Sequence, residues 1–551
     1  MALEVMGCSA RQHYDVLIRG GTIYDGTGSP GFVGDVGVRG DRIALIGDAG
    51  DARGDVEIDA TGRAVSPGFI NMLSWANEAL LVDGRGMSDL KQGVTLEVMG
   101  EGHSMGPLNA QMKADMVRDQ GDIRFDVTWT TLGEYLDHLA ERGVALNVAS
   151  FVGATTLREH EIGYENRAPT ADELARMQAL VRQAMEEGAM GVSSSLIYSP
   201  AFYAKTDELI ALARAAAEYA GLYTSHIRNE GDSLYEAFDE FLTIAREAGI
   251  RAELYHMKAS GRANWDKLDG LFERIEAARA AGLHVTADIY TYHASATGLD
   301  AIMPPWVQEG GPEAWRKRLE DPQVRARVRH DMNTPSQDWD NGYLTAGSPD
   351  NILLVGFKNP KLKPLTGKTL GEVARMRGTE PEYTAMDLVV EDASRIDCVF
   401  FSMSEENIRK KVRQPWVSVC SDAEAIAPEG DFLKRSAHPR AYGSFIRMLG
   451  KFCRDEKLIT LEDAVHRMSG LPAENLKLHE RGLLKEGYHA DIVVFDPARV
   501  ADRATFEKPH QYAVGVEQVF VNGTQVLEDG AHTGAFPGRV VRGPGWSGWQ
   551  R

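Results

Sequence analysis

The middle of the chain alternates short apolar segments with amphipathic segments, and this alternation constrains the fold more than any other feature. The apolar segments read as buried strands and are residues 93–99, 146–153, 191–195, 221–226, 252–256, 283–289 and 416–421. The segments with helical periodicity and alanine-rich faces are residues 171–187, 206–220, 233–248 and 266–281. Repeated strand–helix units over residues 67–480 predict a parallel α/β architecture, a (β/α)8 TIM barrel, with an insertion around residues 300–380.

Both ends of the chain have a different residue pattern. Residues 14–66 contain short β-branched runs that are interrupted by glycine and aspartate, as in hairpins. The same pattern returns at residues 489–496 and 516–523. We therefore expect residues 1–66 and 481–551 to form one small β-sandwich domain, built from both termini around the barrel.

The charge balance narrows the class of partner. Lys and Arg number 60 against 80 Asp and Glu, which gives a formal net charge of −20. Such an acidic surface argues against nucleic acid and against anionic membranes, and leaves a small-molecule substrate as the expected partner. No apolar run reaches the length of about 18 residues that a membrane span requires. Four cysteines among 551 residues do not make a disulfide framework. A homo-oligomer is compatible with these features, but none requires it.

The first ten residues carry no basic segment followed by an apolar run, so no secretory signal is expected and the cytoplasm is the predicted location. The alternative is an exported or lipid-anchored form, because residues 5–8 (VMGC) resemble a lipoprotein cleavage box.

Two histidines come at the ends of successive predicted strands. His226 closes one strand and His256 closes the next, one strand–helix unit later. Because the carboxyl ends of barrel strands meet at one rim, the two imidazoles should be neighbours. Neutral imidazole is a good zinc ligand, so the pair predicts a metal site. The alternative is two ordinary hydrogen-bonded histidines.

Carboxylates occupy two further strand ends. Asp422 follows an apolar strand and could act as a general base towards water at the metal, or could simply cap a turn. If residues 95–101 are extended, Glu97 and Glu101 share one face and point into the barrel. Two inward carboxylates require positive partners, for which a metal, Lys258 or Arg228 are available. The alternative is a solvent-exposed Glu101.

These motifs together resemble the N-acyl-D-amino-acid deacylases (D-aminoacylases) of the amidohydrolase superfamily. The resemblance covers nearly the whole chain and is carried by GGTIYDG at 20–26, PGFI at 67–70, GVSSSLIYSP at 191–200, SHIRNEG at 225–231, HMKASGRANW at 256–265, SD at 421–422, HPRAYG at 438–443 and EGYHADIVVFD at 486–496. It implies a (β/α)8 barrel with a small β-sandwich, and a zinc-dependent amide hydrolase that attacks its substrate with a metal-bound hydroxide.

The chain departs from the family pattern at two places. After PGFI the superfamily normally has a His-x-His pair, but here Leu73 and Trp75 stand at those positions. The cysteine ligand that these deacylases usually carry after the next strand is replaced by Gly102. We infer that Glu101 serves as the substitute ligand, with His103 as the second choice. The prediction is one Zn²⁺ per chain, held by His226, His256 and Glu101.

Three functions remain open at this point. The first is a one-zinc deacylase in which Asp422 is the general base and acid. The second is a cyclic amidase of the hydantoinase or dihydroorotase type, or a dipeptidase-like amidohydrolase, against which the missing His-x-His pair counts. The third is a non-catalytic binding protein on a degenerate scaffold. A decayed enzyme should have lost the strand-end histidines and aspartate together, and here all remain.

The substrate carboxylate requires a cation or several hydrogen-bond donors. The resemblance places Lys258 against it, and Tyr198, Tyr290 and Arg228 are further candidates at the rim. The alternatives are tyrosines of the core and a surface ion pair between Arg228 and Glu230. The D preference follows from the resemblance alone, and the sequence names neither the acyl group nor the side chain.

Overall fold

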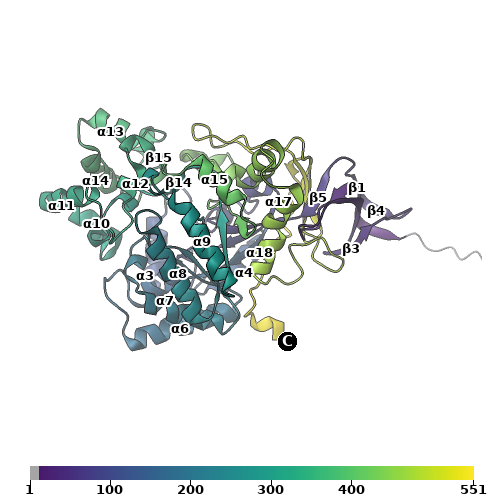
Figure 1. Ribbon diagram of the computed structural model, residues 1–551, viewed down its shortest axis with the longest axis horizontal. Coiled ribbons are helices and arrows are strands. Elements are labelled where there is room, and N and C mark those ends of the chain that lie inside the picture. Colours follow the sequence, from purple (N-terminus) through teal and green to yellow (C-terminus); the bar gives the residue numbers. More distant parts are fainter. Residues whose placement is uncertain (1–11, 551) are drawn as a thin grey trace, which may run out of the picture.

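Figure 1 shows the computed structural model, which describes residues 12–550. Eight parallel strands form its barrel. The strands are β6 (Phe69–Ser74), β7 (Val94–Met99), β8 (Asn147–Ser150) continued by β9 (Val152–Gly153), β10 (Gly191–Ser195), β11 (Leu222–His226), β12 (Arg251–Leu254), β13 (Val285–Ile289) and β17 (Val417–Val419). Each pairs in parallel with the next. The predicted α/β class is thereby confirmed.

The barrel closes between β6 and the segment that follows β17. The backbone N–H of Asp422 donates to the carbonyl of Leu73 at 2.9 Å, and the N–H of Trp75 donates to the carbonyl of Ala423 at 2.9 Å. Asn71 adds a side-chain bond, since its Oδ1 accepts from the N–H of Ser421 at 2.9 Å. Because of this seam, Trp75 and Asp422 lie side by side at the carboxyl end of the barrel.

The helices between the strands bury one face each. They include α4 (Leu132–Arg142), α6 (Ala171–Glu186), α7 (Thr206–Ala217), α8 (Leu234–Ala248) and α9 (Lys267–Ala280). Helix α8 shows the principle: Leu234, Phe238, Phe241 and Ala245 recur every three or four residues and are buried. The helix ends at Gly249, which has φ 65°, a left-handed conformation that glycine adopts without steric cost. The same spacing had predicted this helix.

The two ends of the chain meet in one nine-stranded sheet. Its strands are β1 (His13–Ile23), β2 (Phe32–Arg39), β3 (Arg42–Gly47), β4 (Arg53–Asp59), β5 (Ala64–Pro67), β18 (Ile492–Phe495), β19 (Val516–Val521), β20 (Thr524–Glu528) and β21 (Ala531–His532). The N-terminal and C-terminal strands join where β5 pairs antiparallel with β18. The strands belong to a single sheet, so the sandwich arrangement stays a prediction. Residues 5–8 lie outside the described part of the chain.

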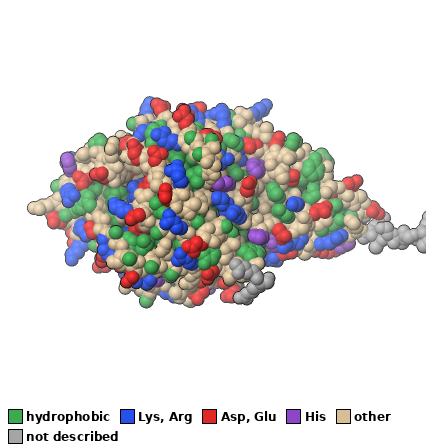
Figure 2. Space-filling model, turned by 60° about the horizontal axis from the view of Figure 1, so that its bottom comes forward, with side chains coloured by type: hydrophobic (Ala, Val, Ile, Leu, Met, Phe, Trp, Pro, Cys, Tyr) green, Lys and Arg blue, Asp and Glu red, His purple; other side chains and the backbone are tan. Residues whose placement is uncertain are grey.

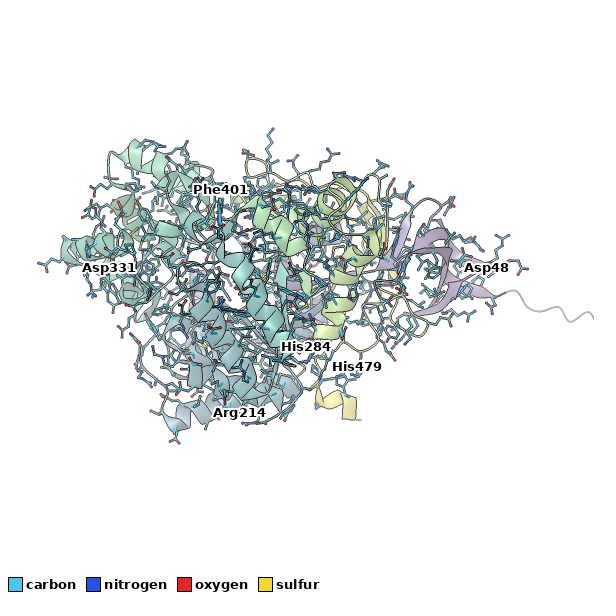
Figure 3. All side chains as sticks on the ribbon, in the orientation of Figure 1. Asp48, Arg214, His284, Asp331, Phe401 and His479 are labelled. Carbon is cyan, nitrogen blue, oxygen red and sulfur yellow. The ribbon has the colours of Figure 1, made fainter. Side chains whose placement is uncertain are left out.

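A long insertion separates β13 from the helix α15 (Glu405–Val412). It contains an antiparallel sheet of β14 (Ser295–Gly298), β16 (Asp397–Phe400) and β15 (Ile352–Gly356), with helices α10 (Gly311–Arg318), α11 (Pro322–Met332), α13 (Leu370–Arg377) and α14 (Pro381–Asp392). The apolar side chains between Leu299 and Phe400 form a core of their own. Asp331 of the insertion and Asp48 of the terminal sheet mark opposite ends of the molecule (Figure 3).

Acidic and basic side chains are interspersed over the face shown in Figure 2, without a continuous basic area. Among the described residues, no helix combines the length and the apolar character needed to cross a membrane.

Two buried carboxyls inside the barrel make stability depend on pH. Burial, and then the charge of Asp288, raise the pKa of Glu253 to about 8. The Glu253 carboxyl accepts hydrogen bonds from Thr286 at 2.9 Å and Asn475 at 3.0 Å. An unfolded glutamate titrates near its ordinary value of about 4.3, so the folded protein holds a proton that the unfolded chain releases between these two values. The stability from this proton is full below the lower value and is lost as pH rises towards 8.

We therefore expect Glu253→Gln to flatten the pH dependence of stability, because glutamine stays neutral at every pH. Between pH 5 and pH 9 the melting temperature of the metal-free wild type should fall more steeply than that of the variant, and the variant should be the more stable at pH 9. Thermal unfolding across this range is the measurement. Parallel curves for the two proteins would show that Glu253 is ionised in the folded state.

Candidate active site

A cavity of about 330 Å³ opens at the carboxyl ends of the barrel strands. Its size suits a small molecule. Its lining from the barrel includes Trp75, Glu101, Ser195, Tyr198, His226, Glu230, His256, Lys258, Tyr290 and Asp422, and the insertion adds Thr297, Gly298, Asp340, Arg395 and Asp397. The insertion therefore covers the mouth of the barrel and supplies one wall of the cavity.

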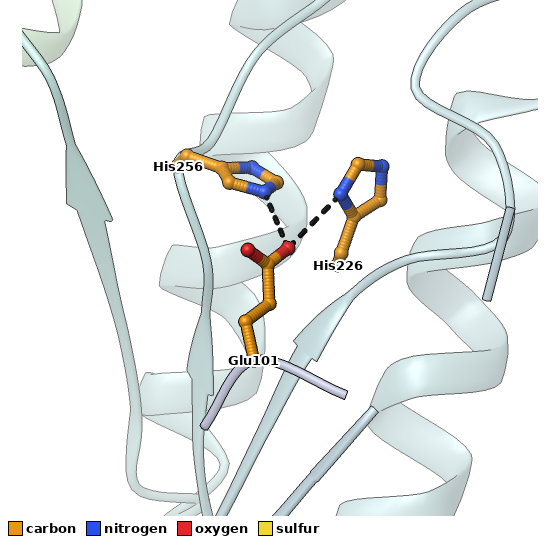
Figure 4. Close-up of side chains that lie close together, drawn as sticks. All are labelled: Glu101, His226 and His256. Atoms are coloured by element: carbon orange, nitrogen blue, oxygen red, sulfur yellow. Dashed lines mark hydrogen bonds and ion pairs between the residues drawn. The ribbon is translucent and has the colours of Figure 1, made fainter. Parts of the chain in front are cut away.

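Glu101, His226 and His256 line this cavity and lie close together, as Figure 4 shows. Oε1 of Glu101 lies 3.2 Å from Nδ1 of His226 and 3.0 Å from Nε2 of His256. One ligand atom from each residue lies within 4.8 Å of the others, and all three side chains are buried. Two imidazole nitrogens and one carboxylate oxygen are a donor set that zinc prefers, with a fourth position left open.

The pKa values of these three residues are consistent with a cation bound between them. Burial opposes the charge of Glu101, but the charge of His256 and hydrogen bonds from both histidines hold the pKa of this carboxyl well below its usual range. Burial lowers the pKa of His226. Burial and Lys258 oppose a charge on His256, yet the charges of Glu101 and Asp422 raise its pKa to about 10. A proton on His256 thus provides the positive charge that a metal ion would supply instead.

The loop after β7 places Glu101 rather than a neighbouring residue beside His226 and His256. Gly100 and Gly102 on either side have φ 98° and 64°, which turn the backbone sharply. A Cβ on Gly102 would lie 2.5 Å from Cβ of Ser195, so this position has no room for a side chain unless the backbone moves. A cysteine side chain at position 102 would not fit this loop, whereas Glu101, the preceding residue, places its carboxylate beside the two histidines.

The strand-end residues His256 and Asp422 have unusual backbones. Their φ angles are 33° and 48°, in the left-handed region that costs energy for residues with a Cβ. Oδ1 of Asp288 accepts from the N–H of His256 at 2.7 Å, and the barrel seam holds the N–H of Asp422. Strain that is held in place by such specific bonds is characteristic of functional positions.

Glu230 and Lys258 support the two histidines from the side away from Glu101. Nζ of Lys258 lies 2.7 Å from Oε1 of Glu230 and 2.6 Å from Nδ1 of His256. The other carboxylate oxygen of Glu230 lies 3.4 Å from Nε2 of His226. A carboxylate beside the outer nitrogens of metal-binding histidines fixes their ring orientation and tautomer.

Asp422 is flanked by one hydrogen-bond donor and one cation. Nε1 of Trp75 donates to Oδ1 at 3.1 Å, and a guanidinium nitrogen of Arg440 lies 2.6 Å from Oδ2. Burial raises the pKa of Asp422, and Arg440 opposes that rise. A raised pKa in contact with the ligand cluster suits a group that takes up a proton and releases it again.

Known proteins are similar to this chain in sequence and in fold. The profile of the Amidohydrolase family matches residues 364–527. The D-aminoacylase of Alcaligenes xylosoxydans xylosoxydans is 34% identical over 545 residues, which cover 97% of this chain and 99% of that protein. A full-length relative at this identity decides the family. The chain belongs to the N-acyl-D-amino-acid deacylases.

Solved deacylase structures agree with this assignment. One is a D-aminoacylase whose binuclear metal centre is described by one-metal activation and second-metal attenuation, with a TM-score of 0.79 at 34% identity, covering 96% of this chain and 100% of that one. Another is the N-acyl-D-glutamate deacylase of Bordetella bronchiseptica with zinc and a phosphonate mimic of the tetrahedral intermediate, with a TM-score of 0.79 at 32% identity and the same coverage. This deacylase is accordingly a metal-dependent amidohydrolase.

The structure of the deacylase brings most of the predicted site residues together. Glu101, His226 and His256 form the cluster, and Asp422 lies beside it. His103, the second choice as a ligand, is turned away and its Nε2 lies 3.0 Å from Glu159. Sequence reasoning had left Glu101 and His103 open, and the geometry favours Glu101.

The predicted substrate contacts divide into two groups. Lys258, Tyr198 and Tyr290 line the cavity, and the hydroxyl of Tyr198 pairs with Thr297 of the insertion at 2.7 Å. Arg228 does not belong to the lining. Its guanidinium donates to Glu240 at 2.8 Å and to the carbonyl of Phe202 at 2.9 Å, so it fastens the outside of the barrel. The alternative pairing of Arg228 with Glu230 is also absent, because Glu230 contacts Lys258.

Several functional contacts were missed by the sequence reasoning. The pairing of Arg440 with Asp422 joins residues of different loops and has no local signal. The contact between Glu230 and His226 could have been predicted, because Glu230 follows His226 by four residues in the same segment. In the sequence, Trp75 indicates only that a histidine is missing from the family pattern. Its contacts with Glu101 and Asp422 are not predictable from that position.

Proposed function

We propose that this protein hydrolyses the amide bond of N-acyl-D-amino acids with a single zinc ion bound by Glu101, His226 and His256. The observation that carries the proposal is the buried cluster of these three ligands beside Asp422 in the lining of a cavity of small-molecule size. The full-length similarity to deacylases supplies the substrate class. Zinc, when bound, supplies a Lewis acid that polarises the amide carbonyl and makes water a stronger nucleophile.

Asp422 is the proposed general base and acid. Its position next to the ligand cluster lets the carboxylate take a proton from the attacking water and pass it to the leaving nitrogen. Arg440 and Trp75 restrict its rotation, because each holds one of its oxygens. The same two residues stabilise the ionised form before the proton arrives.

The substrate carboxylate is proposed to lie against Lys258, with Tyr198 and Tyr290 beside it. Lys258 is buried in the cavity, and the ring of Tyr290 lies 5.9 Å from its ammonium. A charged donor in such a dry place favours an anionic group over a neutral one. The overall negative charge of the protein makes this local cation necessary.

Lys258→Gln should raise KM for an N-acetyl-D-amino acid by about 10–100-fold, which is the worth of one hydrogen bond to a charged group. For the amide of the same substrate, which has no carboxylate, the variant should show a much smaller loss of kcat/KM. Comparing kcat/KM for both substrates separates loss of the carboxylate contact from damage to the neighbouring His256, since damage would lower both equally. Equal losses would remove Lys258 from substrate recognition.

The proposed reaction is tested with zinc-loaded protein and matched pairs of N-acetyl-D- and N-acetyl-L-amino acids, with hydantoins and dipeptides alongside. Release of free amine from the D-enantiomers only is expected. Ring opening of hydantoins would favour a cyclic amidase, and inactivity on the whole panel with zinc bound would favour a binding protein. The panel also identifies the preferred side chain and acyl group.

Further features are proposed with this function. They are a cytoplasmic location, no nucleic-acid or membrane partner, a β-sandwich from residues 1–66 and 481–551, and the barrel over residues 67–480. A homo-oligomer stays open.

A further inference from the structure

The indole of Trp75 links the two carboxylates of the site. Its Nε1 lies 3.1 Å from Oε2 of Glu101 and 3.1 Å from Oδ1 of Asp422. One N–H group is therefore shared between a proposed metal ligand and the proposed general base. Without it, two buried carboxylates would face each other with no positive group between these particular oxygens.

A cation between two neighbouring carboxylates is the usual solution to such repulsion, and in a binuclear hydrolase this cation is a second metal. The residues present do not fit a metal there. The indole nitrogen is a donor only and offers no lone pair to a metal. Leu73, at the other position of the missing histidine pair, is fully buried and apolar.

The backbone fixes the indole in this place. The N–H of Trp75 donates to the carbonyl of Ala423, and the N–H of Asp422 donates to the carbonyl of Leu73, both at 2.9 Å. Trp75 and Asp422 thus belong to the same hydrogen-bonded seam of the barrel. The contact between their side chains follows from this pairing and does not depend on a mobile loop.

We propose that Trp75 takes the place of a second metal ion and makes this deacylase insensitive to attenuation by excess metal. The inference rests on the proposed function. The related D-aminoacylase is described by one-metal activation and second-metal attenuation. Here the indole N–H neutralises part of the charge that would attract the second ion.

The same contact has a second consequence for the first metal. Because Oε2 of Glu101 is held by Trp75, only Oε1 faces the two histidines. Trp75 is in this respect a positioning residue, which directs one oxygen of Glu101 to the metal and leaves the fourth coordination position free.

The test restores the histidine pair. Wild type, Trp75→His and the double variant Leu73→His/Trp75→His are dialysed against excess zinc, washed, and their zinc content per chain is measured. We expect one zinc in the wild type and two in the double variant. Two zinc ions in the wild type would overturn the proposal, as would one in a double variant whose thermal unfolding shows it to be folded.

If the double variant does not fold, the single variant gives the answer. Trp75→His places one imidazole beside the two carboxylates, and we expect it to bind a second zinc at least 10-fold more tightly than the wild type does in a zinc titration. If the folded wild type and the folded Trp75→His variant bind a second zinc ion with equal affinity, the proposal is overturned.

Activity in excess zinc is the second readout. We expect excess zinc to lower the activity of the wild type by less than twofold, and to lower the activity of the variant that binds two ions by at least 10-fold. Equal inhibition of both would overturn the proposal. The zinc count needs no substrate, so failure of the proposed deacylase reaction would leave the count as an independent test of Trp75.

Discussion

Asp422→Asn is expected to lower kcat by about 10²- to 10⁴-fold, the usual contribution of a general base, while zinc remains bound. Asparagine keeps the size of the side chain but accepts no proton. The three proposed metal ligands are unchanged in this variant, because Asp422 lies beside them and contacts Trp75 and Arg440. Measurement of kcat together with zinc content separates loss of proton transfer from loss of metal.

Asp397→Asn is the matched control. Asp397 also lines the cavity, but it belongs to the insertion and its nearest cation is Arg435 at 3.7 Å. The same chemical change at this carboxylate should leave kcat within a few fold. Turnover near the wild-type value in Asp422→Asn would remove this residue from the reaction.

Glu101→Gln is expected to weaken zinc binding by about 100-fold or more, since even residues behind metal ligands contribute about 10–100-fold. Glutamine has the shape of glutamate but lacks the charge that attracts the ion. The two histidines alone would leave the site with too few ligands for a tight zinc complex. Competition with a chelator measures the affinity, and activity should return only at much higher zinc.

His103→Ala distinguishes the two ligands that the sequence had left open. His103 contacts Glu159 and its side chain is 42% exposed, so its removal should leave zinc affinity unchanged. If His103→Ala loses zinc and Glu101→Gln keeps it, the loop must rearrange on metal binding and the ligand assignment is wrong.

Much of the fold could be predicted because its signals are local. The periodicity of α8 lies within its own residues. His226 closes β11 and His256 lies two residues beyond the end of β12, and the apolar character of both strands is visible in the sequence. Successive βα units must lie side by side at a barrel rim, so the neighbourhood of the two histidines followed from chain order. Glu101 could be inferred from the loss of a cysteine at Gly102.

The remaining contacts depend on residues far apart in the chain. Arg440 reaches Asp422, and Trp75 reaches both Asp422 and Glu101, only because the barrel closes between its first and last strands. No pattern within one segment reports this closure. Arg228 illustrates the opposite case: it follows His226 by two residues, yet its side chain bonds to Glu240 and does not line the cavity. Strand ends predict which residues reach the rim, but not which way each turns.

We propose that one zinc ion, held by Glu101, His226 and His256, drives deacylation. The most direct test is a titration of metal-free protein with zinc while the release of amine from the best N-acetyl-D-amino acid is followed. We expect activity to rise in proportion to added zinc and to reach its plateau at one ion per chain. A plateau that requires two ions per chain, or full activity before any zinc is added, would contradict it.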